Sequence, residues 1–316
     1  MSAVVSAVAL GAPHTELLAG WELEVVDLLR AGDAELEAAL RETEALLVNS
    51  HFPVDARVLG FAPRLRAIST VSVGFDHIDV RTAAQRSITV TTTPVLSDAV
   101  ADLTLALITM TLRRLRETID DLSRGVWRNE ILGHDVRGQR LLLIGFGRIA
   151  REVAARALAA KMTVCTYDVR TEIAPMAGVD RVATLAEGLA AADIVSLHVD
   201  LNPSTHHLID ADALARMKPT AILINTARGG VVDQDALRRA LSNGDIAGAG
   251  LDVLETEPPD ADDPILHLPN VVVLPHIGSA TVETRLAMLD CAVDNLVACL
   301  RGEACANALA LLPPEL

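Results

Sequence analysis

Short, uninterrupted apolar runs recur along nearly the whole chain, separated by segments with helical or loop character. A strand that is apolar at every position is buried on both faces, as in a parallel sheet covered by helices. The pattern therefore predicts an α/β fold built on parallel sheets. The expected strands are 2–10, 45–49, 67–70, 89–91, 140–144, 163–167, 194–198, 221–225, 248–253 and 271–274, with partly helical segments at 17–19, 34–41 and 80–86.

A long helix is predicted to begin at Ser97, because Ser97 or Asp98 can cap its first turn and apolar positions recur at helical spacing through Leu122. Gly125 follows as a stop signal. At about 100–200 residues per domain, a chain of 316 residues suggests about two domains. The helix from Ser97 is the natural boundary between them.

The charge balance argues against several classes of partner. Lys and Arg number 27 and Asp and Glu number 42, so the formal net charge is −15. Bulk attraction to nucleic acid or to an anionic membrane surface is therefore not expected. Aromatic residues make up only 2% of the chain, which argues against extended stacking on single-stranded bases. An anionic substrate would need a local basic site.

The chain contains no run of about 18 uncharged apolar residues that would predict a transmembrane helix. Its N-terminal segment has no Lys or Arg before Arg30, so it lacks the positive region of a signal peptide. The cysteines form neither a CxxC pair nor a metal-ligand spacing, and we expect reduced, mostly buried thiols in a cytoplasmic protein. They are Cys165, Cys291, Cys299 and Cys305.

A glycine motif follows the predicted strand 140–144. Gly145, Gly147 and Ala150 fit the G-x-G-x-x-[GA] dinucleotide fingerprint, which combines a tight turn, a close phosphate approach and close helix packing. The pyrophosphate would sit at the helix N-terminus, so Arg148 and Ile149 join Gly145 and Gly147 as candidate cofactor-binding residues. An ordinary tight turn between a strand and a helix is the alternative interpretation.

Asp168 ends the next predicted strand, 23 residues after Gly145, where the fingerprint expects an acid that hydrogen-bonds the ribose hydroxyls. An acid at this place repels a 2′-phosphate, which favours NAD(H) over NADP(H). Arg170 argues in the opposite direction, because a nearby Arg can accommodate that phosphate. Asp168 could also serve only as a helix cap.

Polar residues follow the ends of later predicted strands, where ligands of open α/β sheets bind. They include Arg228, Glu257 and His276. Arg can grip a carboxylate with two parallel hydrogen bonds, His can deliver a proton near neutral pH, and a neighbouring carboxylate favours the protonated ring. Singly, each could be a surface or loop residue. Together they indicate a centre for carbonyl reduction.

Several stretches also occur in the order found in one known family. In combination the chain resembles the D-isomer-specific 2-hydroxyacid dehydrogenases, and within them most closely the glyoxylate/hydroxypyruvate reductases. The resemblance covers most of the chain. The matching stretches are 69–79, 96–103, 141–150, 224–233, 249–253 and 275–281.

The resemblance implies a role for each candidate residue. Arg228 would bind the carboxylate and carbonyl oxygen of the substrate. His276 would be the general acid in reduction, with Glu257 as its partner. Backbone N–H groups of Val73 and Gly74 would hold the substrate carboxylate. The residues around the ribose or nicotinamide would be Thr226, Asp252, His276 and Gly278.

The resemblance further implies two Rossmann/flavodoxin-like parallel-sheet domains, one inserted into the other. The cofactor domain would be residues 97–285, and the discontinuous substrate-binding (lid) domain would be residues 1–96 and 286–316. Closure of the lid would bring Val73 and Gly74 to the nicotinamide and exclude water. In this family the helix that begins at Ser97 commonly lies in a dimer interface, so a homodimer is expected.

The activity implied is NAD(P)H-dependent reduction of a small 2-oxo acid, of the glyoxylate or hydroxypyruvate type, by direct hydride transfer without a metal. Two alternatives remain open. One is the same chemistry on a bulkier acid, such as 2-ketogluconate or a phenylpyruvate, and the other is an NAD(H)-sensing binding protein of the corepressor kind. His51 and Phe52 could line the substrate pocket, or they could simply pack a loop.

The chain departs from the family pattern in two places. Asp102 stands where the family usually has Glu, and the segment between Trp127 and Gly138 looks shorter than in close relatives. Val73 replaces the Lys of a phosphite-oxidising branch, which argues against phosphite as a substrate. The adjacent His206 and His207 show no metal-ligand spacing and are expected at the surface.

Overall fold

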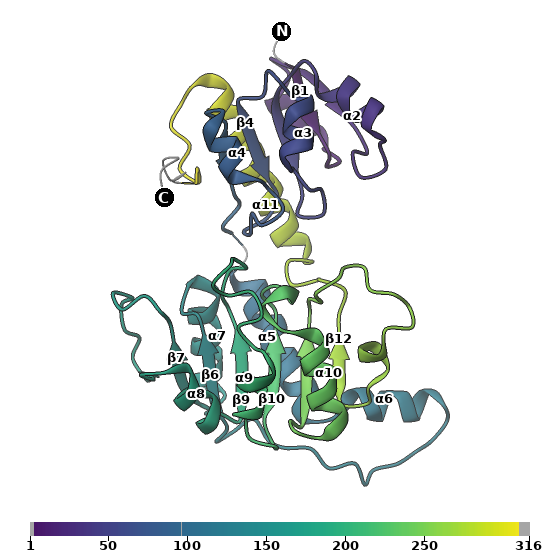
Figure 1. Cartoon of the computed structure of the whole chain (residues 1–316), viewed down its shortest axis with the longest axis vertical. Coiled ribbons are helices and arrows are strands. Elements are labelled where there is room, and N and C mark those ends of the chain that lie inside the picture. Colours follow the sequence, from purple (N-terminus) through teal and green to yellow (C-terminus); the bar gives the residue numbers. More distant parts are fainter. Residues whose placement is uncertain (1–2, 96, 310–316) are drawn as a thin grey trace. The chain divides into compact units, whose positions relative to one another are not determined.

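The computed structural model describes residues 3–95 and 97–309, and it divides into two compact units (Figure 1). Unit 1 consists of Met1–Leu96 and Thr281–Leu316, and unit 2 of Ser97–Ala280. Both are α/β units with fully parallel sheets, as the apolar runs predict. Among the described residues no helix is both long and apolar enough to cross a membrane.

Unit 1 holds a five-stranded sheet with the order β2-β1-β3-β4-β5. Its central strands are buried along their length and stack in register, with Val5 beside Leu46 and Leu46 beside Ile68. The strands are β1 Ala3–Ser6, β2 Glu22–Val25, β3 Thr43–Val48, β4 Ala67–Thr70 and β5 Thr89–Thr91. The helices are α1 Ala12–Leu17, α2 Asp33–Leu40, α3 Ala56–Phe61, α4 Val80–Gln85 and α11 Val282–Arg301.

Helix α11 explains why the second boundary of unit 1 lies at Thr281 rather than at residue 286. The Thr281 hydroxyl caps the helix by accepting a hydrogen bond from the Thr284 N–H at 3.1 Å. Further along, the Ser69 hydroxyl on β4 donates to the Ala292 carbonyl at 2.8 Å, and Asn295 Nδ2 donates to the Thr92 carbonyl at 3.1 Å. The whole helix therefore belongs with the sheet on which it packs.

Unit 2 holds a seven-stranded sheet with the order β12-β11-β10-β9-β6-β7-β8. The chain adds β7 and β8 on one side of β6 and then returns to place β9 on the other side. This reversal creates a switch point at the carboxyl ends of β6 and β9, where ligands of such sheets bind. The strands are β6 Arg140–Ile144, β7 Thr163–Tyr167, β8 Val179–Arg181, β9 Ile194–Leu197, β10 Ile222–Asn225, β11 Gly248–Leu251 and β12 Val271–Val273.

Two hydrophobic clusters cover the faces of this sheet. Leu141 and Leu143 of β6 belong to the cluster that contains residues of α5 and α7, whereas Leu142 and Ile144 belong to the cluster that contains residues of α8, α9 and α10. This alternation is the two-sided burial that the apolar runs predict. The helices are α5 Ser97–Leu112, α6 Leu115–Ser123, α7 Arg148–Ala159, α8 Leu185–Ala191, α9 Ala211–Ala215 and α10 Gln234–Asn243, with short 3-10 turns η1 Gly229–Val231 and η2 Pro264–His267.

The prediction of one continuous helix from Ser97 through Leu122 is wrong. The helix ends at Leu112, and Arg114 has a φ of 53° in the left-handed region before α6 starts. The Leu112 carbonyl, which a continuous helix would pair within itself, instead accepts a hydrogen bond from the His134 N–H at 2.9 Å. A contact from a distant segment therefore replaces the helical bond at the break.

Asp102, the residue that departs from the family pattern, forms an ion pair within unit 2. Arg156 on α7 donates from Nε to Asp102 at 2.6 Å and from Nη2 to Asp98 at 2.7 Å. Both acids lie on α5, so the guanidinium joins the two helices across their packed faces. The shorter Asp side chain thus still reaches a cationic partner.

Candidate active site

The loops that carry the candidate catalytic residues leave neighbouring strands at the same edge of the unit 2 sheet. Arg228 follows β10, Glu257 follows β11 and His276 follows β12, and these strands are adjacent in the order β12-β11-β10. Because parallel strands end on the same side, their carboxyl-terminal loops gather there. The sheet order thus explains how residues far apart in sequence come together.

His276 and Glu257 form a direct hydrogen bond, with 2.7 Å between Nδ1 of the ring and Oε2 of the carboxylate. Both side chains are about one-third exposed, at 30% and 31%. The second Glu257 oxygen, Oε1, accepts from the Leu254 N–H at 2.9 Å. The carboxylate is therefore held on both sides, and it orients the imidazole through Nδ1.

Glu257 is poised to remain ionised. Burial by itself would raise the pKa of this carboxyl group, but hydrogen bonds from His276 and Leu254 and the positive charge of Arg228 outweigh it. The pKa of Glu257 consequently lies below its ordinary value. Because an ionised carboxylate can only accept hydrogen bonds, Nδ1 of His276 is the donor in this pair.

Asp252 holds the turn that carries His276, a role that cannot be predicted from the sequence. Its side chain is almost fully buried, and its two oxygens accept hydrogen bonds from the N–H groups of Ile277 and Gly278, each at 2.8 Å. The Asp252 carbonyl also accepts from the His276 N–H at 2.8 Å. Burial raises the pKa of Asp252, although the two N–H donors act against this shift. The residue fixes the turn in which His276 has a φ of 54°.

Arg228 lies in a loop that is tied to the end of β10 and to the loop of Glu257. Asn225 accepts a hydrogen bond from the Ala227 N–H at 3.0 Å and donates to the Arg228 carbonyl at 2.9 Å. A Cβ on Gly229 would lie 1.9 Å from the backbone of Leu254, so only glycine fits where the two loops touch. This close approach couples the position of the guanidinium to the Leu254–Glu257 turn.

Thr226, which the resemblance places near the cofactor, contacts α5. Its hydroxyl lies 3.0 Å from the hydroxyl of Thr104, and Thr104 also donates to the Val100 carbonyl at 2.7 Å. Thr104 is buried, and its contact with Thr226 cannot be predicted from sequence, because a threonine inside a helix carries no functional signal of its own. The pair fixes the start of the Arg228 loop.

The glycine motif has the backbone form that a dinucleotide loop needs. Gly145 has a φ of 86°, and a Cβ there would lie 2.6 Å from the His198 carbonyl oxygen. Gly147 caps α7, and apart from its chain neighbours no described atom lies within 4 Å of the position where its Cβ would be. Arg148 is exposed and Ile149 half-buried in the first turn, while Ala150 is fully buried. This open cradle at a helix N-terminus fits a pyrophosphate.

Asp168 and Arg170, whose charges favour NAD and NADP respectively, form hydrogen bonds with each other. Arg170 donates from Nε to one Asp168 oxygen at 3.1 Å and from Nη2 to the other at 3.0 Å. The Phe146 N–H in the glycine loop donates to the same carboxylate at 2.8 Å. Burial would raise the pKa of Asp168, but these donors outweigh it and lower the pKa below its ordinary value.

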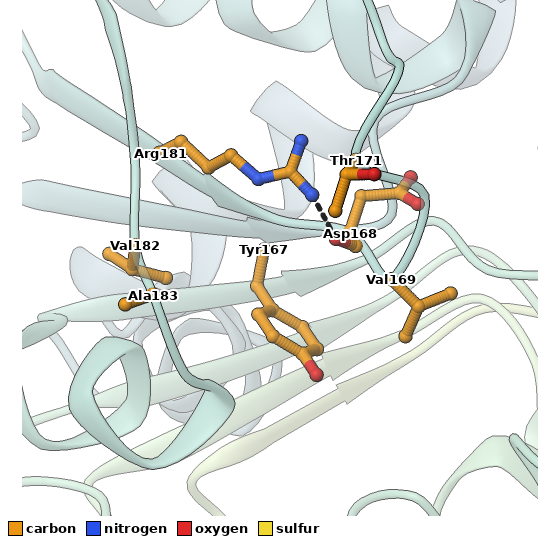
Figure 2. Close-up of a pocket in the computed structure, with 7 residues that line it drawn as sticks. All are labelled: Tyr167, Asp168, Val169, Thr171, Arg181, Val182 and Ala183. Carbon is orange, nitrogen blue, oxygen red and sulfur yellow. Dashed lines mark hydrogen bonds between the residues drawn. The ribbon is translucent and has the colours of Figure 1, made fainter.

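A cavity of about 330 Å³ adjoins Asp168 (Figure 2). Arg181, from β8, reaches across it and donates from Nη2 to the carbonyl of Arg170 at 2.9 Å, with a further bond to the Asp168 carbonyl. The sequence did not single out Arg181, because β8 is a short edge strand. The lining residues are Tyr167, Asp168, Val169, Thr171, Arg181, Val182 and Ala183.

Val73 and Gly74 lie in unit 1, in the turn that follows β4. The Ser72 hydroxyl donates to the Gly74 carbonyl and lies 3.0 Å from the Thr70 hydroxyl. The Ser72 carbonyl accepts from the Thr93 N–H at 2.8 Å. Both residues are half-buried, and these hydrogen bonds hold the turn in which they lie.

His51 and Phe52 separate into different environments of unit 1. Phe52 is only 3% exposed and belongs to the hydrophobic cluster of that unit. His51 is exposed, and its N–H donates to the Asn49 side chain at 3.0 Å. The loop-packing interpretation therefore fits Phe52.

Comparison with known proteins identifies relatives over nearly the whole chain. A family model described as the NAD-binding domain of D-isomer-specific 2-hydroxyacid dehydrogenases matches residues 105–278. A glyoxylate reductase from Korarchaeum cryptofilum (strain OPF8) is 44% identical over 285 residues, which are 88% of this chain and 83% of that protein.

Solved structures agree with this match. The NADPH-dependent glyoxylate/hydroxypyruvate reductase of Sinorhizobium meliloti, in complex with NADP and malonate, has a TM-score of 0.89 and 33% identity, covering 99% of this chain and 98% of that chain. The D-lactate dehydrogenase of Aquifex aeolicus, in complex with NAD and lactic acid, has a TM-score of 0.86 and 31% identity, covering 99% and 100%. These relatives contain either NADP or NAD.

Proposed function

The chain belongs to the D-isomer-specific 2-hydroxyacid dehydrogenase family, and we propose that it reduces a small 2-oxo acid of the glyoxylate or hydroxypyruvate type to the D-2-hydroxy acid. The single observation that carries this proposal is the His276–Glu257 hydrogen bond of 2.7 Å, in a site where the charge of Arg228 also acts on Glu257. A proton donor, its orienting carboxylate and a cation are the groups that carbonyl reduction requires.

A reduced nicotinamide bound in unit 2 would supply the hydride that C2 of the 2-oxo acid accepts. His276 donates its proton to the carbonyl oxygen as the C=O bond becomes a C–O–H bond. Glu257 keeps the ring oriented through Nδ1 during this transfer. Arg228 binds the substrate carboxylate and stabilises the negative charge that develops on the carbonyl oxygen.

Unit 2 would bind the dinucleotide along the Gly145–Ala150 turn, with the pyrophosphate on the N-terminus of α7. Unit 1 would act as the lid, with the N–H groups of Val73 and Gly74 directed at the substrate carboxylate. Thr226, Asp252 and Gly278 would border the nicotinamide and its ribose. For Asp252 this contact would be indirect, because both of its oxygens already accept backbone N–H groups.

Steady-state turnover with a panel of 2-oxo acids tests the proposed function. We expect NADH oxidation at 340 nm with glyoxylate and hydroxypyruvate, at a kcat/KM above the values for 2-ketogluconate and phenylpyruvate. A reversed order would support the bulkier-substrate alternative. Saturable binding of NADH without turnover of any member would support the cofactor-sensing alternative.

We propose that the cofactor is NAD(H) rather than NADP(H). Asp168 is buried and ionised, and its carboxylate lies where the 2′-hydroxyl of the adenosine ribose would approach. Arg170 partly neutralises it through the paired hydrogen bonds described above. The remaining negative charge would disfavour a 2′-phosphate, so discrimination is expected to be moderate rather than absolute.

Asp168→Asn is expected to raise the ratio of kcat/KM for NADPH to that for NADH by roughly tenfold, about 1.4 kcal/mol. The amide can still accept the Phe146 N–H, but it removes the charge that opposes the 2′-phosphate. Arg170→Gln is the matched variant, and it should lower the same ratio. A parent enzyme that prefers NADPH, or an unchanged ratio in Asp168→Asn, contradicts the assignment.

We also propose that the protein is a homodimer that uses α6 and the segment after it. This region exposes large apolar side chains, which on a monomer usually mark an interaction surface. Trp127 is 87% exposed and Leu132 is 79% exposed. Ile119, Leu122 and Val126 are the other exposed apolar residues of this region.

Light scattering after size exclusion is expected to give twice the chain mass of 33.5 kDa for the parent, and a shift toward the monomer for Trp127→Glu. A charge placed in an apolar interface opposes association, while the exposed position spares the fold. Val282→Glu changes a similarly exposed apolar residue on α11 and should leave the mass unchanged. A monomeric parent, or an unaltered Trp127→Glu dimer, contradicts the proposal.

All four cysteines lie in the described part of the chain, and none of them forms a disulfide. Cys165 is buried, whereas Cys291, Cys299 and Cys305 are half-buried. We propose a cytoplasmic location on this basis, because free thiols persist in a reducing compartment.

A further inference from the structure

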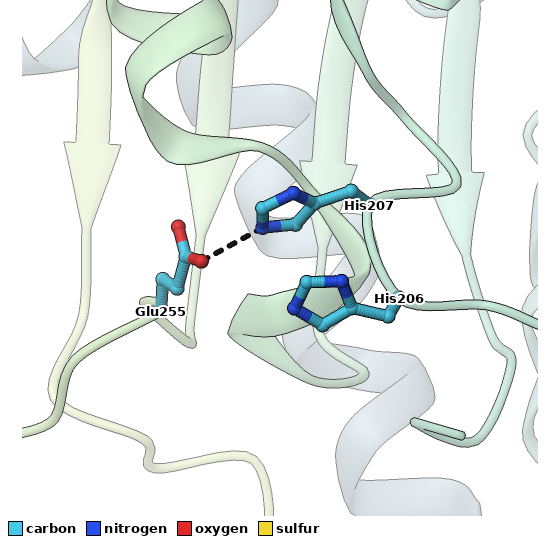
Figure 3. Close-up of side chains that lie close together, drawn as sticks. All are labelled: His206, His207 and Glu255. Carbon is cyan, nitrogen blue, oxygen red and sulfur yellow. Dashed lines mark hydrogen bonds and ion pairs between the residues drawn. The ribbon is translucent and has the colours of Figure 1, made fainter. Parts of the chain in front are cut away.

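A second cluster of ionisable side chains lies in unit 2 among residues to which the proposed reduction assigns no role. His206 and His207 come from the loop after β9, and Glu255 comes from the loop after β11 (Figure 3). His207 Nε2 lies 2.7 Å from Glu255 Oε1. The two imidazole rings are stacked, with centroids 3.9 Å apart and 23° between their planes.

We propose that His206, His207 and Glu255 form a binding site for a divalent transition-metal ion of the Zn²⁺ class. Imidazole nitrogens together with one carboxylate are a donor set that Zn²⁺, Ni²⁺ and Cu²⁺ accept well. Hard cations such as Mg²⁺ prefer sites made of oxygen alone. The two nitrogen donors therefore select the borderline metals.

The distances among the ligand atoms are compatible with a single ion. One ligand atom from each side chain lies within 4.8 Å of the other two. Metal–ligand bonds of roughly 2.0–2.1 Å in a tetrahedral arrangement place ligand atoms about 3.3 Å apart. The His207–Glu255 separation of 2.7 Å is shorter than this value and the 4.8 Å limit is longer, so small side-chain rotations suffice.

The backbone holds both histidines in place before any ion binds. Adjacent residues in extended chain direct their side chains apart, but here His207 has a φ of 51° in the left-handed region and the rings lie together. The His207 N–H donates to the Gly230 carbonyl at 2.9 Å, and the His206 N–H donates to the Asn202 carbonyl at 2.9 Å. The loop therefore presents a preformed pair of imidazoles.

Glu255 is also oriented by groups other than the histidines. Its N–H donates to the Gln234 side chain at 3.0 Å, and its Oε2 accepts from the Gln234 N–H at 3.4 Å. This leaves Oε1 directed at His207, as Figure 3 shows. Outer contacts of this kind fix the direction of ligating carboxylates in metal sites.

The surrounding charge favours a cation. His207 and Glu255 line a cavity of about 680 Å³ whose other walls are rich in aspartate. Arg238 is the cationic residue among those lining it, and Arg238 lies 3.3 Å from Asp235. A cavity lined mainly by charges of one sign raises the local concentration of counter-ions. The aspartates are Asp233, Asp235, Asp260, Asp262 and Asp263.

Calorimetric titration with ZnCl₂ of the full, tag-free chain, after chelator treatment and desalting, tests the proposal. We expect saturable binding of one Zn²⁺ per chain and a rise in Tm with added Zn²⁺. His206→Gln and Glu255→Gln should each weaken the affinity by at least about tenfold. His134→Gln replaces an exposed histidine elsewhere in unit 2 and should bind like the parent.

Co²⁺ provides a second readout that separates this site from the half-buried thiols. A site made of imidazoles and a carboxylate gives visible ligand-field bands without the strong near-ultraviolet charge-transfer band of thiolate ligation. The proposal is overturned if the parent shows no saturable binding, if His206→Gln and Glu255→Gln bind as the parent does, or if the thiolate band is present. None of these outcomes depends on the reductase activity.

Discussion

His276→Gln is expected to lower kcat for glyoxylate reduction by about 10²–10⁴-fold, with a much smaller change in the KM for NADH. Glutamine can keep a hydrogen bond to Glu257, but its amide cannot release a proton near neutral pH. In the parent, the ionised Glu257 accepts a hydrogen bond from Nδ1 and holds the ring of His276 in one orientation. The variant therefore loses the proton that the carbonyl oxygen must receive as hydride arrives at C2.

His134→Gln is the matched control for this variant, because it makes the same chemical change at an exposed histidine outside the candidate site. It should retain the parent kcat. Binding of NADH to His276→Gln, followed by fluorescence, verifies that the cofactor site is intact. If His276→Gln reduces glyoxylate at a rate near that of the parent, His276 is not the general acid.

Arg228→Ala is expected to raise the KM for the 2-oxo acid strongly and to lower kcat/KM by at least on the order of 10²-fold. Each hydrogen bond to a charged group contributes roughly 1.5–3 kcal/mol, and a bidentate Arg–carboxylate contact contains two of them. Loss of the guanidinium also removes stabilisation of the charge on the carbonyl oxygen. In a chain with a net charge of −15, bulk electrostatics cannot replace this local cation.

Arg228→Lys separates charge from geometry. It should recover part of the lost kcat/KM, because the charge returns without the planar fork. NADH affinity is the internal control and should change by no more than about twofold in both variants, a range set by the usual scatter of single-site effects. An unchanged KM for the 2-oxo acid in Arg228→Ala would remove the carboxylate-binding role.

Much of the unit 2 sheet can be predicted from sequence, because its strands are apolar at nearly every position. The predicted ranges for β6 and β7 coincide with Arg140–Ile144 and Thr163–Tyr167. The edge strands β2 and β8 escape prediction because they are short and mostly exposed, with charged residues such as Glu22 and Arg181. An edge strand forms by hydrogen bonding to one neighbouring strand, so its own residues need not be apolar and buried.

The break between α5 and α6 could not be predicted for a different reason. The local sequence continues a helical pattern, and the interruption depends on the His134 N–H reaching the Leu112 carbonyl from a later segment. Likewise, the boundary of unit 1 lies at Thr281, the N-cap of α11, because this helix packs on strands that are far away in sequence. Such long-range contacts have no local signature.

In the candidate site, too, some features can be predicted from the sequence, whereas others depend on contacts between distant residues. Arg228, Glu257 and His276 stand out because their residue types and strand-end positions suggest chemistry. The structure adds what spacing cannot supply: the burial of Asp252 beneath the His276 turn, and the direct pairing of Asp168 with Arg170. The contact between His207 and Glu255 joins residues 48 positions apart, so no motif reveals it.

The transfer of deuterium to hydroxypyruvate from NADH deuterated at both C4 positions is the most direct test of hydride transfer by this protein. We expect the purified chain to form the D-2-hydroxy acid with deuterium at C2, at one atom per turnover. Product without deuterium at C2, product of the L configuration, or no product at any pH between about 5 and 8, the range in which histidine changes charge, would contradict it.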